Sequence, residues 1–394
     1  AESPRVRERG AGARCAAMEP LGALPALRDI ARALGAGEGW MTHVRTGAYF
    51  SSLLAALAVI LRLYPWAAVW AKRPLGLPLA AAYSLAALAA TWRLILIFFV
   101  QHTRQYATHA DPPNLFVDAY RLVCDDPAGW VWSCMLLSWV CVACLHVEIE
   151  GRRRRLPPAL LLCFMMAAFL GAVSLAFPLL LLLLATPVSP PVHGGGIFLH
   201  NTFLWPMCLF LALASTALLP LTVSGPKGAF ISALVILHLI LILPFAYNLV
   251  PSSVSVQQQA SSSFVRRLYL TLACVCLPLH LGSLVVAFQH SQQGFFSPSI
   301  PSAVTKAQLS AMLWHLVSAT WRNTCQASIS IDAVLASLSG ACYMLNRGGS
   351  KALIYVVASP LVSPGAALAL FAAARGDAIQ HEWSLGQLAR TKRR

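Results

Sequence analysis

The chain has 394 residues, of which 58% are hydrophobic and only 11% are charged, and its formal net charge is +15. Soluble domains carry about 25% charged residues, so this composition excludes a soluble enzyme with a large polar surface. The positive charge does not indicate nucleic acid. The cations lie in the first 45 residues, the loops and the last 20 residues, where the positive-inside rule and anionic lipids explain them.

The two ends of the chain differ in composition from its middle. The first 17 residues are rich in Arg, Gly, Ala and Pro and show no amphipathic period. We therefore expect a basic, disordered tail over 1–45, a transmembrane helical domain over 46–374 and a second basic tail over 375–394.

Nine largely apolar segments predict membrane spans, within a range of eight to ten. A helix needs roughly 20 apolar residues to cross a hydrocarbon core of about 30 Å. The predicted spans are 46–64, 79–100, 130–147, 159–185, 197–221, 230–250, 269–288, 327–345 and 353–373. The predicted fold class is therefore an all-α, polytopic transmembrane helical bundle.

The strongest of these segments is 159–185, which holds 27 residues without a charge. At about 1.5 Å per residue it reaches roughly 40 Å, so we expect one tilted or bent span with its bend near Pro178. Four consecutive cations precede it and mark the cytoplasmic side. These topology markers are Arg152, Arg153, Arg154 and Arg155.

Nine crossings assign the remaining charges to two sides. Segments expected on the side of Arg152 are Lys72/Arg73, Lys227, 306–322 and the C-terminal tail. Arg266/Arg267, Arg347/Lys351 and the Arg-rich N-terminus fall on the opposite side, against the positive-inside rule. The C-terminus is thus expected in the cytoplasm. Its closing Arg390-Thr-Lys392-Arg-Arg loosely resembles a dibasic retrieval signal, but a plain stop of cations is the preferred interpretation. The expected location is an endomembrane such as the ER, or the plasma membrane.

Three connections are longer than turns. The segment 115–123 follows Asp-Pro-Pro-Asn, which is typical of a helix start, and 302–322 carries apolar residues at helical spacing. Both predict interfacial helices, and the second alternatively predicts a re-entrant helix or a tenth span. The Ser/Gln-rich segment 251–264 predicts a flexible loop.

Asp332 is the main candidate for a functional residue, because it is an acid within the predicted span 327–345. Ser328 and Ser339 share its helix face and complete a candidate intramembrane polar site. The functional interpretation is a protonatable or cation-coordinating group in a transport path. The structural alternative is a helix–helix hydrogen bond or an ion pair with Arg62 or Arg93, two arginines that can also extend to the headgroups.

Histidines accompany prolines in three of the spans. His238 and His280 lie at similar predicted depth and are the second pair of candidates, either sharing a cavity or making hydrogen bonds across the bundle. No sequence motif of a metalloenzyme, nucleotide-binding loop or serine hydrolase occurs. Cys141 and Cys144 form one C-x-x-C pair on an apolar segment, where cysteine acts as a small hydrophobe. We therefore expect no catalytic residues, no metal and no cofactor.

Short stretches resemble a family of fungal multi-pass membrane proteins of unknown function. They are Ala119-Tyr-Arg-Leu-Val, Gly129-Trp-Val-Trp-Ser, Glu150-Gly-Arg-Arg-Arg and Ser328-Ile-Ser-Ile-Asp332 followed by Ser337-Leu-Ser. The resemblance implies the multi-pass architecture and a fungal source, and it implies no activity.

Three functions stay open from the sequence. The leading hypothesis is a transporter or channel-like protein for a small solute or ion, with Asp332 as its working residue. The second is a membrane-embedded lipid-modifying enzyme, such as an acyltransferase, that uses His238 or His280. The third is a structural or assembly subunit without a substrate. The expected partners are membrane lipids and a small solute or ion, not nucleic acid.

Overall fold

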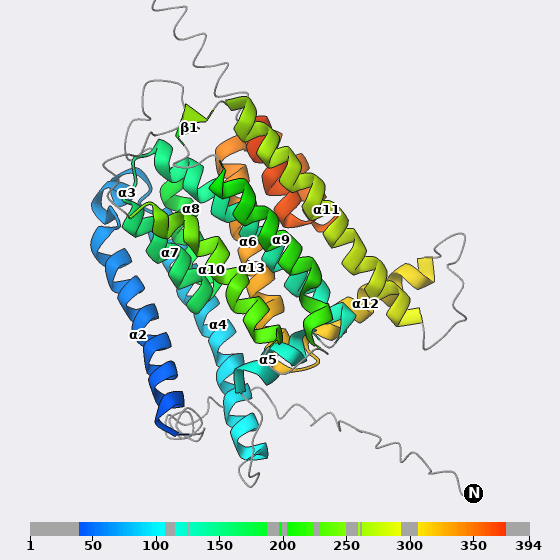
Figure 1. Ribbon diagram of the computed structural model, residues 1–394. Helices are drawn as coiled ribbons and strands as arrows, with labels where there is room; N and C mark the ends of the chain where they lie inside the picture. The colour runs from blue at the N-terminus through cyan, green and yellow to red at the C-terminus, as the bar shows by residue number, and fades with distance from the viewer. Residues whose placement is uncertain are drawn as a thin grey trace, which may run out of the picture.

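The structure is a computed structural model that describes residues 39–106, 115–124, 126–186, 197–198, 203–223, 229–249, 259–260, 262–292 and 306–375. Almost all of these residues are helical and form one elongated bundle (Figure 1). The basic tails predicted at 1–45 and 375–394 lie almost entirely outside the described residues, as does most of the loop predicted at 251–264.

The predicted all-α class is confirmed. The helices are α2 (Gly39–Leu63), α3 (Trp66–Lys72), α4 (Gly76–Gln105), α5 (Leu115–Cys124), α6 (Pro127–Arg153), α7 (Pro158–Leu170), α8 (Val173–Ala185), α9 (Leu204–Val223), α10 (Ala229–Tyr247), α11 (Ser262–Gln292), α12 (Lys306–Thr320), α13 (Thr324–Gly348) and α14 (Leu353–Val362), with a 3₁₀ turn at Gly349–Ala352 and a last helix at Pro364–Arg375. Two short strands, β1 (Ile197–Phe198) and β2 (Gln259–Ala260), pair antiparallel.

The number of membrane-crossing helices is smaller than the nine predicted spans. In the described part of the chain, six helical segments are long and apolar enough to cross a membrane, or seven if α2 and α3, which meet at a 60° bend, form one span. The seven are α2 with α3, α4, α6, α9, α10, α11 and α13. The count of nine is therefore not confirmed, and the difference lies in the segments 159–185 and 353–373.

The segment 159–185 is a hairpin of two half-helices, α7 and α8, and not one bent span. Each half has 13 residues and so extends about 20 Å, which is less than a membrane core. Arg154 Nη1 donates a hydrogen bond of 2.5 Å to the carbonyl oxygen of Thr186. Because these residues precede α7 and follow α8, the chain enters and leaves at the same end of the bundle. We call α7 and α8 the first hairpin.

The break between the two half-helices falls at Gly171, not at the predicted Pro178, which lies inside α8. A Cβ atom on residue 171 would lie 2.7 Å from the carbonyl oxygen of Ala167 and 2.8 Å from Leu175 Cδ2. Both distances are shorter than real Cβ contacts, so the tight reversal of direction needs glycine at this position.

The segment 353–373 forms a second hairpin, made of α14 and the helix Pro364–Arg375. The turn between them is at Ser363, whose φ of 82° ends α14 and whose hydroxyl accepts a 3.0 Å hydrogen bond from the Ala366 N–H. Arg375 Nη1 donates to the carbonyl oxygen of Arg347, at the end of α13, over 2.7 Å. This hairpin therefore also returns to the end of the bundle from which it started.

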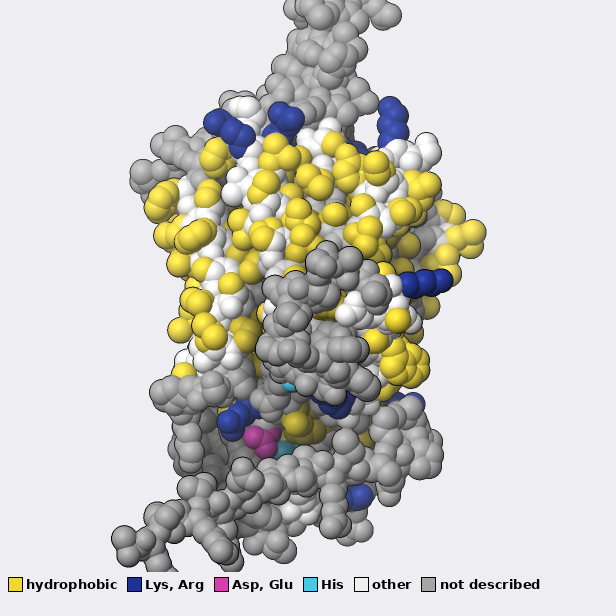
Figure 2. Space-filling model, turned by 90° about the vertical axis from the view of Figure 1, so that its right-hand side faces the viewer, with side chains coloured by type: hydrophobic (Ala, Val, Ile, Leu, Met, Phe, Trp, Pro, Cys, Tyr) yellow, Lys and Arg dark blue, Asp and Glu magenta, His cyan; other side chains and the backbone are white. Residues whose placement is uncertain are grey.

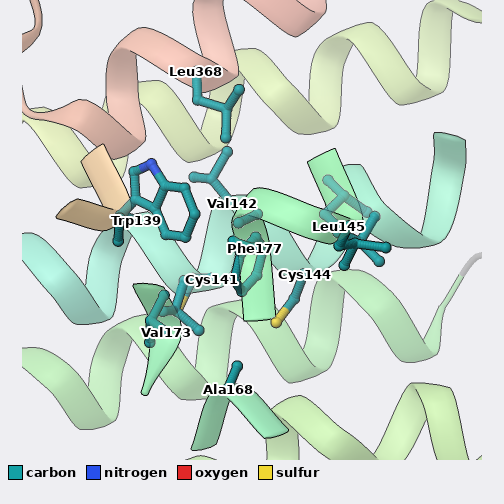
Figure 3. Packing of buried hydrophobic residues seen from close by; sticks show 14 of the residues in the cluster. Trp139, Cys141, Val142, Cys144, Leu145, Ala168, Val173, Phe177 and Leu368 are labelled. Atoms are coloured by element: carbon teal, nitrogen blue, oxygen red, sulfur yellow. The ribbon is translucent and has the colours of Figure 1, made fainter. Parts of the chain in front are cut away.

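Helix α6 is the centre of the bundle, because 83% of the residues in its apolar stretch are buried. The two hairpins pack against it from different sides. Trp139 of α6 meets Phe177 of the first hairpin edge to face, with ring centroids 4.7 Å apart. Leu368 of the second hairpin lies across α6 from Ala168 of the first (Figure 3). Cys141 is completely buried in this core and behaves as a small apolar residue.

Gly365 allows the second hairpin to approach the α6 backbone closely. A Cβ atom at this position would lie 3.0 Å from the carbonyl carbon and oxygen of Ser138, and backbone atoms cannot rotate away. We expect Gly365→Ala to destabilise the protein by about 1–3 kcal/mol, as overpacking does. The measurement is the unfolding midpoint in detergent. The control is Gly282→Ala on α11, where a Cβ meets nothing within 4 Å and helix propensity favours alanine. Equal midpoints for the two variants would contradict this account of the packing.

The outer surface of the bundle is apolar over its middle. Figure 2 shows hydrophobic side chains covering the central part of one face, with Lys and Arg side chains at its upper edge. Large apolar side chains are exposed on the described helices, among them Leu281, Val285 and Ile354, the last with 70% of its surface exposed. A continuous apolar belt of this kind suits a lipid environment.

The two hairpins change the predicted distribution of charge between the two ends. His146, near the end of α6, accepts or donates a hydrogen bond with Tyr269 OH over 3.1 Å, which places the start of α11 at the end occupied by Arg152. Arg73 Nη2 lies 3.2 Å from Asn346 Oδ1 and brings the end of α13 there as well. We call this the arginine-rich end.

Three segments therefore lie at the other end of the bundle from the one expected for nine spans. Arg266/Arg267 and Arg347/Lys351 lie at the arginine-rich end, and not opposite to it. Arg322 pairs with Asp126 over 2.9 Å at the start of α6, which is the other end. Because a hairpin does not cross the bundle, the ends of the described helices between the two hairpins lie on the opposite side from the one predicted. Helices α5 and α12 both form as expected, at the end away from the arginines.

Candidate functional site: a cavity at the tip of the first hairpin

Asp332 binds the tip of the first hairpin. Its Oδ1 accepts a hydrogen bond from the Ser174 N–H over 2.7 Å, and its Oδ2 accepts one from the Val173 N–H over 3.1 Å. These two donors belong to the first turn of α8, where backbone N–H groups have no partner within the helix. Asp332 thus caps α8 from another helix, α13, in the interior of the bundle.

The carbonyl oxygens at the end of α7 also have partners. Trp92 Nε1 donates to the Gly171 carbonyl oxygen over 2.7 Å, and the Tyr49 hydroxyl donates to the Leu170 carbonyl oxygen. A broken helix survives inside a membrane only where other groups satisfy its freed backbone. Side chains from α2, α4 and α13 meet this need at the tip of the first hairpin.

The N-terminus of the helix that Asp332 caps favours a negative charge on its carboxyl group. A helix N-terminus carries a partial positive charge of about half a unit, which favours a carboxylate. The predicted ion pair with Arg62 or Arg93 is not formed, since among the described residues Asp332 makes no salt bridge and its oxygens bind α8. The alternative of an interhelical hydrogen bond is confirmed, with backbone N–H groups as the donors.

A cavity of about 190 Å³ adjoins this tip. Its wall is mostly aromatic and aliphatic, with a few polar groups at the inner end. The aromatic wall consists of Tyr49, Phe50, Trp92, Phe99, Tyr120, Trp130, Phe169 and Phe230, and the polar groups are those of Thr91, Ser133, His238, Ser328 and Asp332. Residues of α5 and of the first turns of α6 and α13 line it too, so the cavity extends from the hairpin tip toward the end away from the arginines.

The two predicted serines line different cavities. Ser328 lines the cavity just described and donates to the Thr91 carbonyl oxygen over 3.0 Å. Ser339 donates to the Leu335 carbonyl oxygen of its own helix over 2.9 Å. It lines a second cavity of about 240 Å³ among α4, α8 and α13, on the arginine-rich side of the hairpin tip. The polar face of α13 therefore connects both cavities, with Asp332 between them.

The two predicted histidines do not share a cavity. His238 lines the first cavity, with its Nδ1 bonded to the Leu234 carbonyl oxygen of its own helix over 2.7 Å and its ring 5.0 Å from that of Phe169. His280, on α11, contacts the second hairpin instead, with its Nε2 3.3 Å from the Pro360 carbonyl oxygen. Within the described residues, neither ring forms a hydrogen bond to a carboxylate or hydroxyl group.

A charged network at the arginine-rich end was missed from the sequence. Helix α6 continues six residues past the predicted span and carries Glu148 and Glu150 into the bundle, where they are 0% and 5% exposed. Asp332 is thus not the only buried acid. Arg152 Nε lies 2.7 Å from Glu148 Oε1, and Arg153 Nη1 lies 2.5 Å from Glu150 Oε1. Three of the four topology markers, Arg152, Arg153 and Arg154, are therefore also structural ion-pair partners.

Neighbouring helices complete this network. Asn248 Nδ2 donates to both oxygens of Glu148 over 3.0 and 3.2 Å, and His146 bonds to the hydroxyl groups of Tyr269 and Tyr343. Burial lowers the pKa of the Arg154 guanidinium, although Glu150 opposes the shift. The network holds the ends of α6, α10, α11 and α13 together. The i, i+4 spacing of Glu148 with Arg152 and of Glu150 with Arg154 was the sequence signal for it.

The apolar belt, the long helices and the two satisfied helix breaks define a multi-pass α-helical membrane protein. No protein-family model, curated protein or solved structure matches the chain.

Proposed function

We propose that the protein transports a small solute and that the first hairpin is its gate. The observation that carries this proposal is the position of Asp332 between two cavities, where it holds the hairpin tip by two hydrogen bonds. Transporters commonly place their substrate sites at discontinuous helices near the membrane midplane. The polar face of α13 is the path in this proposal.

The gate works by exchange of hydrogen bonds. In the described state the α8 N-terminus is closed onto Asp332, so the first cavity does not continue into the second. Solute in the first cavity competes with the N–H groups of Val173 and Ser174 for the carboxylate. When the tip moves away from α13, the solute passes along this helix toward Ser339. The hydrogen bonds that Tyr49 and Trp92 donate to the hairpin tip guide its return.

The wall of the first cavity favours a largely apolar solute with one polar group. A hydrated ion would lose its water against aromatic rings, and few polar atoms are present to replace that water. A polar head on the solute meets Asp332, Ser328 and His238, while its apolar part lies among the rings toward α5. The lining of the first cavity therefore favours a small amphiphilic solute over an ion as the transported species. No observation favours the lipid-modifying enzyme.

We also propose that the arginine-rich end faces the cytoplasm. With two hairpins and seven crossings, the cations of α3, α6, α11, α13 and the last helix gather on one side, as the positive-inside rule requires. The C-terminus is then cytoplasmic, in an endomembrane or the plasma membrane. Lipid headgroups are the expected partners of these cations.

Photocrosslinking tests the proposed solute site. The probe is an alcohol of about ten carbons with a diazirine in its chain, added to the protein in lipid nanodiscs and mapped by mass spectrometry. We expect adducts on residues of the first cavity, such as Phe169. They should decrease at least about tenfold in Ala168→Phe, which fills the cavity wall, because an occupied site cannot hold the probe.

The matched control is Ala55→Phe, which makes the same change on the exposed face of α2. This variant should keep the cavity adducts. Adducts confined to exposed residues, or cavity adducts unaffected by Ala168→Phe, would contradict the proposed solute site.

A further inference from the structure

Three potential metal ligands converge at the end of the bundle away from the arginines. They are Asp126, the N-cap of α6; His290, near the end of α11; and His315, on α12. One ligand atom of each lies within 4.8 Å of the other two. The three come from separate segments, so no spacing motif in the sequence indicated them.

The packing of three helices brings these residues together. Ala128 and Val131 of α6 form a small apolar cluster with Ala287 of α11 and Ala319 of α12. Trp132 Nε1 also donates to the Leu316 carbonyl oxygen of α12 over 3.2 Å. The backbone around the three ligands is therefore fixed by contacts that do not involve the ligands themselves.

His315 has an unused ligand atom at this site. Its Nε2 is buried and has no hydrogen-bond partner among the described residues. The rings of His290 and His315 lie nearly parallel, 6.4 Å apart, so no hydrogen bond between them uses this atom. A buried nitrogen without a partner is unfavourable, and a metal ion would supply the missing interaction.

The closing movement that a metal requires is small. Ligand atoms around a tetrahedral Zn²⁺ lie about 3.3 Å from one another, given bond lengths of about 2.0–2.1 Å. The side chain of His290 is exposed at the end of its helix and is free to rotate by that amount. Arg322 Nη1 now lies 2.9 Å from Asp126 Oδ2, and its half-exposed side chain is able to move aside.

We propose that Asp126, His290 and His315 bind one divalent transition metal of the Zn²⁺ class. Two imidazoles and one carboxylate form a common ligand set for Zn²⁺ and leave the fourth position to water. The metal and the Arg322 guanidinium compete for the same carboxylate. Binding ties α12 to α6 and α11 and releases Arg322.

Zinc titration of the purified full-length protein tests this site. After treatment with a chelator, the protein in nanodiscs is titrated with Zn²⁺ by calorimetry and with Co²⁺ by absorption spectroscopy. We expect one equivalent to bind and Co²⁺ to show visible bands of tetrahedral coordination. His290→Ala and His315→Ala should each weaken binding at least about tenfold, the loss seen when even an outer partner of a metal ligand is removed.

Two further variants make the result specific. His280→Gln changes a histidine of α11 that lies at the second hairpin, and it should bind Zn²⁺ like the wild type. Arg322→Ala removes the competing cation and should tighten binding. Absence of stoichiometric binding, full binding by both alanine variants at His290 and His315, or weaker binding by Arg322→Ala would overturn the proposal.

Discussion

Replacing Asp332 with alanine is expected to destabilise the protein by about 3 kcal/mol and to lower its abundance in the membrane. The substitution leaves the N–H groups of Val173 and Ser174 without an acceptor, and each buried donor left unpaired costs about 1–3 kcal/mol. Asp332→Asn keeps one acceptor oxygen and should lose about half as much. The measurement is unfolding by SDS titration in a mild detergent.

The control for this prediction is Ser339→Ala, on the same face of α13. Its hydroxyl donates to a carbonyl oxygen of its own helix and caps no other segment, so the change in unfolding free energy should stay within about 0.5 kcal/mol. If Asp332→Ala unfolds at the same SDS fraction as wild type, the capping role of Asp332 is refuted. A transport site without a structural role would produce that result.

Replacing Glu148 with alanine is expected to have a similar or larger effect. Glu148 is completely buried and binds both Arg152 and Asn248, so its removal leaves a cation and an amide at the arginine-rich end without their partner. Breaking a buried ion pair from one side costs about 3–5 kcal/mol, and the one-fifth exposure of the Arg152 side chain places the expected loss near 3 kcal/mol. Thermal unfolding in nanodiscs measures it.

The double variant Glu148→Met/Arg152→Met separates the ion pair from simple packing. Replacing both partners by apolar side chains removes the unpaired charge, so the double variant should be more stable than Glu148→Ala. A double variant that is as unstable as the sum of both single changes would show that the two residues act independently. That outcome would contradict the network.

Much of the fold follows from hydropathy, because apolar length and the absence of charge predict which segments are buried in the bundle. Six of the nine predicted spans begin within three residues of the start of a helix, and the other three begin within seven. Hydropathy does not predict direction, however. The segment 159–185 is long enough to cross, and only Gly171 marks the point where the chain reverses. In the segment 353–373 the reversal of the chain is marked by Ser363 followed by Pro364.

The candidate site was partly predictable for the same physical reason. An acid in an apolar helix needs a partner, so Asp332 was identifiable, but its partner is a backbone that only the reversal at Gly171 exposes. Ser328 was grouped with Asp332 and lines the first cavity with it, whereas Ser339 does not. His238 and His280 were predicted as a pair, but of the two His238 lines this cavity and His280 does not, because depth along separate helices says nothing of their neighbours. Asp126, His290 and His315 meet only through tertiary packing.

The account depends most on the first hairpin, and one topology measurement tests it directly. Short epitope tags are inserted after Arg155 and after Pro190, and their accessibility to antibody is compared in intact and permeabilised cells. We expect both tags on the same side of the membrane, because the chain enters and leaves the bundle at the same end. Tags on opposite sides would mean that 159–185 crosses the membrane, and would contradict both the hairpin and the gate proposed from it.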